Sequence, residues 1–204
     1  MDLAKFLDLL RTRKFYLRRA DLFADKLEGA LPPGHRQLLD AVSRVTTRIP
    51  DANAYQRRAR MGTFASCWTI GAHDNMALWQ LYGGASTSIA ITTTTAQLAK
   101  CVSSWGERVV IKKIEYVNHR KRFEAAIGRY TDPLEFKNIA YAFEKEARLM
   151  VSRHLQGWEN NPQELRLPIS DLNALIRSVV VAPEAQPWFY WLAFFGSLAV
   201  VWAL

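Results

Sequence analysis

The most informative segment of this chain is Phe143-Glu144-Lys145-Glu146-Ala147-Arg148-Leu149-Met150. Apolar and charged residues alternate in it, which predicts a strand from Glu146 to Val151. Side chains two residues apart share a face of a strand, so we expect Glu144, Glu146 and Arg148 to lie together on one face. Neighbouring carboxylates raise each other's pKa, and an adjacent guanidinium lowers both. These three residues are therefore candidate catalytic groups for acid–base chemistry, although a structural ion-pair network is the commoner role.

A second informative segment runs Cys67-Trp68-Thr69-Ile70-Gly71-Ala72-His73-Asp74-Asn75-Met76-Ala77-Leu78-Trp79-Gln80-Leu81-Tyr82. Its first residues complete a predicted buried strand over 63–70, and its last ones form a short helix that Gly83-Gly84 ends. Trp79 and Tyr82 are three residues apart and share one side of that helix. Their rings could stack on a ligand or fill the core with their polar atoms satisfied.

The remaining elements predict an α+β fold. Helices and strands alternate irregularly along the chain, which does not fit a doubly wound parallel sheet. We expect a single globular domain over residues 1–184, with a central, mostly antiparallel mixed sheet flanked by helices. The other predicted strands are 14–18, 86–92, 109–116, 165–169 and 178–181, and the principal predicted helices are 2–12, 35–47, 51–60 and 94–103.

The composition indicates a basic protein with a substantial core. Half of its 204 residues are hydrophobic, 12% are aromatic, and the formal net charge is +8. Such a charge would attract nucleic acid, anionic lipid or a phosphate-bearing ligand. The basic residues that could form this surface are Arg57, Arg58, Arg60, Lys112, Lys113, Arg120, Lys121 and Arg122. The sequence leaves the cofactor and the oligomeric state open, and no nucleic-acid-binding motif accompanies the charge.

Neither cysteine belongs to a metal-binding pattern. Cys67 falls in a predicted buried strand, where it is expected to pack as a small apolar residue. No zinc spacing, phosphate-binding glycine loop or Ser/His/Asp signature occurs, so we predict no metal site. The chain begins with an amphipathic charged stretch instead of a signal peptide, which predicts a reducing, cytoplasmic location for its body.

The last twenty residues, 185–204, contain no charged side chain. A helix of about 20 residues spans roughly 30 Å, the thickness of a bilayer's hydrocarbon core. Tryptophan and tyrosine gather near both ends of this segment, at Trp188, Tyr190, Trp191 and Trp202, as in interfacial aromatic belts. The sequence therefore predicts a single-pass membrane anchor over 185–204, with the basic body on the cytoplasmic side.

Four motifs follow one another along the chain. They are Phe15-Tyr16 with Phe23-Ala24-Asp25-Lys26-Leu27-Glu28-Gly29, Cys67-Trp68 with Met76, Trp79 and Tyr82, Phe143 to Arg148, and Val179-Val180-Val181-Ala182-Pro183. Their order resembles the bacterial domain-of-unknown-function family numbered 2971. The resemblance implies a fold and a set of residues but no settled activity. The apolar tail departs from that family, whose members tend to end in a polar helix.

We combine these motifs into a candidate ligand-binding site. Its aromatic residues are Tyr16, Trp79 and Tyr82, and its acidic residues in the first motif are Asp25 and Glu28. With the charged strand residues they would form a cleft for a small-molecule ligand, in either an enzyme or a binding domain. Asp25 could also serve only to bond the backbone amides of its turn.

The order of several residues also has a weaker similarity to ADP-ribosyltransferases. That similarity implies Arg18 or Arg19 on the phosphates of NAD, Ser86-Thr87-Ser88 beside the nicotinamide, and Glu144 or Glu146 at the developing oxocarbenium centre. A further alternative is a non-enzymatic defence or stress effector that binds anionic lipid or nucleic acid. The sequence favours none of these reactions decisively, and whether the chain is an enzyme stays open at this level.

Overall fold

The computed structural model of this chain describes residues 1–71, 74–119, 121, 123, 125–155 and 157–202. The chain forms two compact units. Unit 1 consists of Met1–Phe15, Gly71–Trp105 and Arg166–Leu204, and unit 2 of Tyr16–Ile70 and Gly106–Leu165. Each unit is therefore built from segments that are far apart in the sequence.

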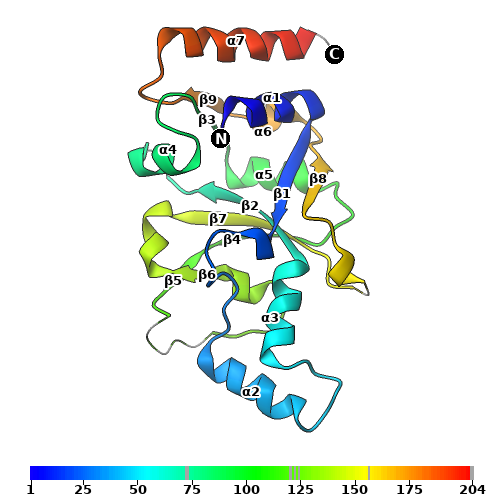
Figure 1. The fold of residues 1–204 in the computed structure, drawn as a ribbon. Coiled ribbons are helices and arrows are strands. Elements are labelled where there is room, and N and C mark those ends of the chain that lie inside the picture. Colours follow the sequence, from blue (N-terminus) through cyan, green and yellow to red (C-terminus); the bar gives the residue numbers. More distant parts are fainter. Residues whose placement is uncertain (72–73, 120, 122, 124, 156, 203–204) are drawn as a thin grey trace. The chain divides into compact units, whose positions relative to one another are not determined.

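Helices and strands are interspersed along the chain (Figure 1). The α-helices are α1 (Leu3–Thr12), α2 (Pro33–Ser43), α3 (Ala52–Met61), α4 (Met76–Tyr82), α5 (Thr95–Val102), α6 (Leu172–Leu175) and α7 (Pro187–Trp202). The strands are β1 (Lys14–Arg19), β2 (Thr63–Thr69), β3 (Ile89–Thr92), β4 (Val109–Lys113), β5 (Glu115–Val117), β6 (Phe136–Asn138), β7 (Glu146–Ser152), β8 (Glu164–Pro168) and β9 (Ser178–Val181). Short 3₁₀ helices are η1 (Ala20–Leu22), η2 (Asp132–Glu135), η3 (Ile139–Glu144) and η4 (Trp158–Asn160).

The largest sheet has five strands in the order β4-β7-β2-β1-β8. β7 pairs antiparallel with β2 from Thr63↔Ser152 to Thr69↔Glu146, and with β4 on its other side. The predicted α+β class and antiparallel sheet are confirmed. The parallel pair, β5 with β6, belongs to a separate two-stranded sheet, and β3 with β9 forms another.

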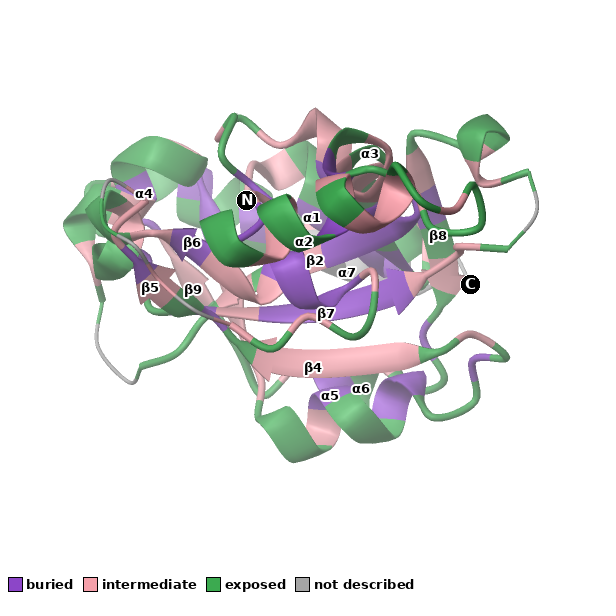
Figure 2. Cartoon of the chain, turned by 90° about the horizontal axis from the view of Figure 1, so that it is seen from below, coloured by how far each residue is buried: buried purple, intermediate pink, exposed green. Residues whose placement is uncertain are grey.

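β7 and the first part of β2, Thr63 to Ala65, form the buried centre of unit 2, and Figure 2 shows β7 largely in the colour of buried residues. β7 begins at Glu146, as the alternation predicts, and continues to Ser152. On one face its apolar residues, Leu149 and Val151, are fully buried. On the other face Met150 packs with Ala20, Ala65 and Leu134, so both faces of this strand are covered. The charged residues of β7 must therefore be paired inside the protein.

Local signals in the sequence explain several helix ends. Asp51 caps α3 by accepting a hydrogen bond from the amide of Ala54, and Asn75 caps α4 through the amide of Ala77. Thr94 and Gln97 form a reciprocal capping box at the start of α5, which satisfies amides that the first turn leaves without helical partners. The predicted strand over 86–92 is shorter than expected, because only Ile89–Thr92 pairs with β9.

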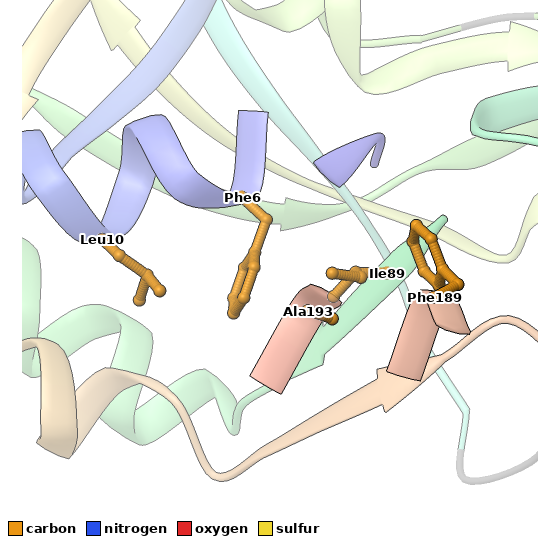
Figure 3. Close-up of a cluster of buried hydrophobic side chains, with 5 residues drawn as sticks. All are labelled: Phe6, Leu10, Ile89, Phe189 and Ala193. Atoms are coloured by element: carbon orange, nitrogen blue, oxygen red, sulfur yellow. The ribbon is translucent and has the colours of Figure 1, made fainter. Parts of the chain in front are cut away.

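The core of unit 1 joins α1, β3 and α7. Figure 3 shows Phe6 and Leu10 from α1 gathered with Ile89 from β3 and with Phe189 and Ala193 from α7. The helical spacing of each pair, four residues apart, places both members on one face. The amino group of Met1 donates to the carbonyl of Ile89, which ties the chain end to the same strand.

The prediction of a membrane-spanning tail is wrong. Within the described residues, no helix combines the length and the apolar character that crossing a membrane requires. α7 has 16 residues and begins at Pro187, two residues later than the uncharged segment, whereas a span needs about 20. Part of its apolar surface is used inside unit 1, since Phe189 and Ala193 are buried against α1 and β3. The predicted single-pass location with a cytoplasmic body is corrected accordingly; residues 203–204 lie outside the described part.

Truncating Phe6 tests the unit 1 core. Phe6 is only 2% exposed, so Phe6→Ala removes a buried ring and leaves a cavity that should cost about 3–5 kcal/mol of unfolding free energy. The matched control is Leu81→Ala, because Leu81 is 63% exposed and its loss should change stability by no more than about 0.5 kcal/mol. Urea unfolding followed by circular dichroism measures both, and equal losses in the two variants would contradict this assignment of the core.

Candidate functional site

Five charged side chains are buried together in unit 2. They are Glu28, Lys137, Glu144, Glu146 and Arg148, with exposures of 1%, 7%, 4%, 3% and 1%. Charged residues are rarely buried this deeply unless they are paired with one another. We refer to these five residues as the charge cluster, and it is the candidate functional site of the chain.

Separate elements bring the charge cluster together. Glu146 and Arg148 project from the same face of β7, and Lys137 comes from β6. Glu144 is the last residue of η3, not a residue of the predicted strand. It still reaches the cluster because Lys145 follows in a left-handed conformation, with φ of 46°, and turns the chain into β7.

Glu28 reaches the cluster from the turn that precedes Gly29. Gly29 has φ of 70°, a conformation that side chains disfavour. A Cβ atom at this position would also lie 3.1 Å from Cγ of Arg60 and 3.2 Å from Cδ2 of Leu134. Glycine at this position therefore allows the turn to pack closely enough for Glu28 to enter the cluster.

The guanidinium of Arg148 directs all its N–H donors at oxygen atoms. Two bonds, of 2.8 and 2.7 Å, go to the two carboxylate oxygens of Glu28. Two more, of 2.6 and 3.0 Å, go to the two carboxylate oxygens of Glu146. The last, of 2.9 Å, goes to the backbone carbonyl of Leu134. Arg148 is thus held between two carboxylates in the paired geometry that a planar guanidinium favours.

Lys137 is the second cation of the cluster. Its ammonium donates to Glu144 and, at 3.0 Å, to Glu146, and lies 3.9 Å from Glu28. The ring of Tyr141 lies under it, with Nζ 4.7 Å from the ring centroid, a cation–π arrangement. Each oxygen of Glu146 therefore receives a charged donor.

These contacts fix the protonation states of the cluster. Burial raises the pKa of Glu146, but the hydrogen bond and charge of Arg148 more than offset it, and the pKa falls to about 2. Burial lowers the pKa of Lys137, yet its bonds to Glu144 and Glu146 bring that pKa above its usual value. The pKa of Arg148 is likewise raised by Glu28 and Glu146 against the effect of burial. At neutral pH all three groups are charged.

The fixed charges make the cluster unsuited to acid–base catalysis. A general base works best with a pKa near the working pH and with a free lone pair aimed at its substrate. Glu146 has a pKa of about 2 and bonds to Arg148 and Lys137 on its two oxygens. In this geometry the cluster serves as an ion-pair network that holds β6, β7 and the Glu28 turn together.

Cys67 and Tyr116 border the cluster. Cys67 on β2 lies directly opposite Arg148 on β7, and its thiol donates a hydrogen bond to the Glu146 carboxylate. Cys67 is exposed as a residue, contrary to the expectation of a packed core residue, but its sulfur lies against the Glu146 carboxylate. Burial of the sulfur and the charge of Glu146 raise the pKa of the thiol, so it stays protonated. The hydroxyl of Tyr116 accepts the amide hydrogen of Glu146 at 2.7 Å.

The other predicted ligand-binding residues are distributed over both units. Tyr16 and Asp25 lie in unit 2, where Tyr16 is 42% exposed. Asp25 accepts the amide of Leu27 at 2.9 Å within its turn, as the alternative interpretation of that residue expects. Trp79 and Tyr82 lie on α4 of unit 1; Trp79 is buried against Ala85 and Ala182, and Tyr82 is 58% exposed.

The residues named by the ADP-ribosyltransferase similarity have other partners. Arg19 pairs with Asp21 at 2.7 Å and also donates to the carbonyl of Asn161. Ser86 and Thr87 lie in a bend before β3 and not on a strand. Glu146 is the carboxylate that Arg148 and Lys137 already occupy. The partners of Arg19 and Glu146 therefore do not support that similarity.

Sequence reasoning missed Lys137 and a stack of rings in unit 2. Lys137 is a single lysine in a three-residue strand, and no sequence pattern marks it. In the stack, Tyr55 packs on Tyr130 with ring centroids 4.6 Å apart, and Tyr130 packs on His154 at 4.9 Å. The guanidinium of Arg58 lies 4.7 Å from the Tyr130 centroid. Only the three-residue spacing of Tyr55 and Arg58 on α3 could have suggested that they share a face.

His154 is held neutral in this stack. Burial and the nearby charge of Arg58 lower its pKa to about 4. Its Nε2 lies 3.1 Å from the hydroxyl of Thr63, and Nδ1 has no hydrogen-bond partner in the described part of the chain. A Cβ atom on Gly62 would lie 2.0 Å from Nδ1, so a larger residue there would displace the ring.

Comparison with protein families, curated proteins and solved structures finds no match for this chain. The resemblance to family 2971 therefore stays a prediction based on the motifs alone. Within the described residues, no group of three or more His, Cys, Asp or Glu side chains is placed to hold a metal ion.

Removing the guanidinium of Arg148 should strongly destabilise the protein. Arg148→Met leaves Glu28 and Glu146 buried without their main partner, which should cost about 3–5 kcal/mol. Arg148→Lys should recover only part of this loss, because an ammonium cannot bridge two carboxylates in the same plane. Chemical denaturation measures both variants against Arg57→Met, an exposed arginine of α3, which should be near wild type. A neutral Arg148→Met would show that the cluster does not hold unit 2 together.

The pKa of His154 predicts a loss of stability in mild acid. Its folded pKa of about 4 lies below the ordinary value of 6.5, so the unfolded state binds more protons between these values. This contribution is complete above about pH 6.5 and should be lost as the pH falls toward 4. His154→Phe keeps a ring on Tyr130 but cannot be protonated, so it should remove this part of the pH dependence. Urea midpoints at several pH values test this, with His35→Phe as the control that should keep the wild-type slope.

Proposed function

We propose that this chain is a ligand-binding protein in which unit 2 holds a small polar molecule beside Tyr16 and Cys67. The charge cluster would support this site from the same face of the sheet and would not itself take part in a reaction. The observation that carries the proposal is the exposure of Cys67 directly opposite Arg148, which is 1% exposed. On this face of the sheet, the residue on β7 is therefore buried, whereas its neighbour on β2 is exposed.

The strand register locates the exposed part of β2. β1 pairs with β2 at Arg18↔Ala65 and Arg19↔Phe64, whereas β2 pairs with β7 as far as Thr69. Cys67 and Thr69 lie beyond Phe64 and Ala65 along β2, in the exposed part of this strand.

The alternation of side chains places Tyr16 on the same face as Cys67. Tyr16 lies two residues before Arg18, and Cys67 lies two residues after Ala65, the partner of Arg18. Positions two apart in a strand point the same way, so both side chains share the face that carries Arg148. Tyr16 is 42% exposed and Thr69 is also exposed.

The chemistry of these side chains suits an uncharged ligand. Tyr16 offers a ring for stacking, Thr69 a hydroxyl, and Cys67 a thiol that stays protonated because its pKa is raised. The charges beside them are already paired with one another. A planar polar molecule could stack on the tyrosine and bond the hydroxyl.

The contacts of the basic residues give less support to an anionic partner. Arg58 stacks on Tyr130, Arg60 donates to the carbonyl of Asp21, and Lys112 lies 3.4 Å from Glu135. Each of these cations is thus engaged within unit 2. Arg120 and Arg122, which the sequence groups with them, lie outside the described residues.

A fragment screen with a blocking variant tests the proposed site. Neutral aromatic alcohols and amides should shift the NMR amide signals of Tyr16, Cys67 and Thr69. Cys67→Trp should fill the opening and abolish these shifts, whereas Leu81→Trp, at an exposed position of unit 1, should leave them intact. Binding that Cys67→Trp leaves unchanged would reject this location.

A further inference from the structure

α7 carries an exposed aromatic surface on unit 1. Trp188, Trp191, Phe194 and Phe195 are exposed by 58%, 60%, 55% and 58%. With 100° between successive helical residues, these four positions fall within about 120° of one another on the helix. We call them the α7 face. Tyr190 and Leu192, which are 48% and 50% exposed, lie on its two flanks.

The opposite side of α7 is already used by unit 1. Phe189 and Ala193 are buried with Phe6 and Leu10 of α1. A Cβ atom on Gly196 would lie 3.4 Å from Leu7, so α1 also passes close to the later part of the helix. α7 is therefore held in place by its buried side, and its aromatic face is presented outward on a fixed helix.

The rings of the α7 face pack against one another. Trp191 and Phe195 are stacked, with centroids 5.8 Å apart and an interplanar angle of 23°. Phe194 meets Phe195 edge to face at 5.5 Å. Rings that restrain one another lose little conformational freedom on binding, which lowers the cost of forming an interface.

We propose that the α7 face binds a second copy of this chain, helix against helix, in a two-fold symmetric dimer. A two-fold interface brings the same patch of both copies together, so that patch must be complementary to itself. Residues 185–204 contain no charged side chain, and two such faces meet without like-charge repulsion. The α7 face also offers no charge by which a partner of opposite charge could recognise it.

The composition and area of the α7 face fit a dimer interface. The centres of protein interfaces are rich in Trp, Tyr and Phe and poor in charged residues. Four aromatic side chains of about 200 Å² each, a little more than half exposed, offer roughly 450 Å² per copy. Two copies would then bury about 900 Å², and the flanking Tyr190 and Leu192 raise the total above the roughly 1,000 Å² that a specific interface requires.

Sedimentation equilibrium of the full chain at several concentrations tests this proposal. The wild type should approach twice the 23.3 kDa of one chain. Phe194→Glu and Trp191→Lys each place a charge at the centre of the face, and each should weaken dimerisation at least about 30-fold. Because both side chains are more than half exposed, the variants should keep the wild-type circular dichroism spectrum and unfolding midpoint.

The control is Leu81→Glu, an equally exposed apolar residue of unit 1 on α4, which should leave the dimer intact. A wild-type chain that stays monomeric at every concentration would overturn the proposal. So would a dimer that survives both α7 variants. A monomer that co-sediments with phosphatidylcholine–phosphatidylserine vesicles, and loses this property in Phe194→Glu, would show that the face binds lipid instead. None of these results depends on the ligand site of unit 2.

Discussion

The structure of unit 2 depends on the guanidinium of Arg148. Burying a cation of this kind costs several kcal/mol unless its donors are satisfied. Its N–H groups all reach oxygen atoms, on Glu28, Glu146 and the carbonyl of Leu134. These partners belong to a turn near the start of the chain, to β7 and to η2, so one side chain fixes three segments. Phe23 packs over the same group, 5.4 Å from ring centroid to Cζ, and helps to exclude water from it.

This arrangement explains why residues that suit catalysis by type do not suit it by environment. In the sequence, Glu144, Glu146 and Arg148 look like an acid–base group because carboxylates and a guanidinium lie close together. In the structure, Lys137 and Arg148 take up the oxygens of Glu146 and hold its pKa near 2. The same contacts that stabilise the charges remove their capacity to exchange protons at neutral pH. The accessible chemistry lies beside the cluster, at Tyr16, Cys67 and Thr69.

The apolar tail has one side that is buried in unit 1 and another that is exposed. A helix that is apolar on all sides suggests a lipid environment, because a surface helix usually keeps a polar stripe. In unit 1, Phe189 and Ala193 on one side of α7 are buried with α1 and β3, while the aromatic residues of the other side are exposed. The segment therefore has two apolar sides for two reasons. The first is internal packing, and the second, in our proposal, is contact with another copy.

Local patterns in the sequence were sufficient for the elements that depend on neighbouring residues. The alternation from Glu146 onward predicts β7, Asp51 and Thr94 predict the starts of α3 and α5, and irregular alternation of elements predicts the α+β class. These features follow from periodicity and capping, which act within a few residues. The pairing of Arg148 with Glu28 joins residues 120 positions apart; the motifs supplied both residues for one cleft but not the bonds between them. Lys137, the exposure of Cys67 and the shared core of α1 and α7 had no local signal, because burial and charge pairing arise only when distant segments pack together.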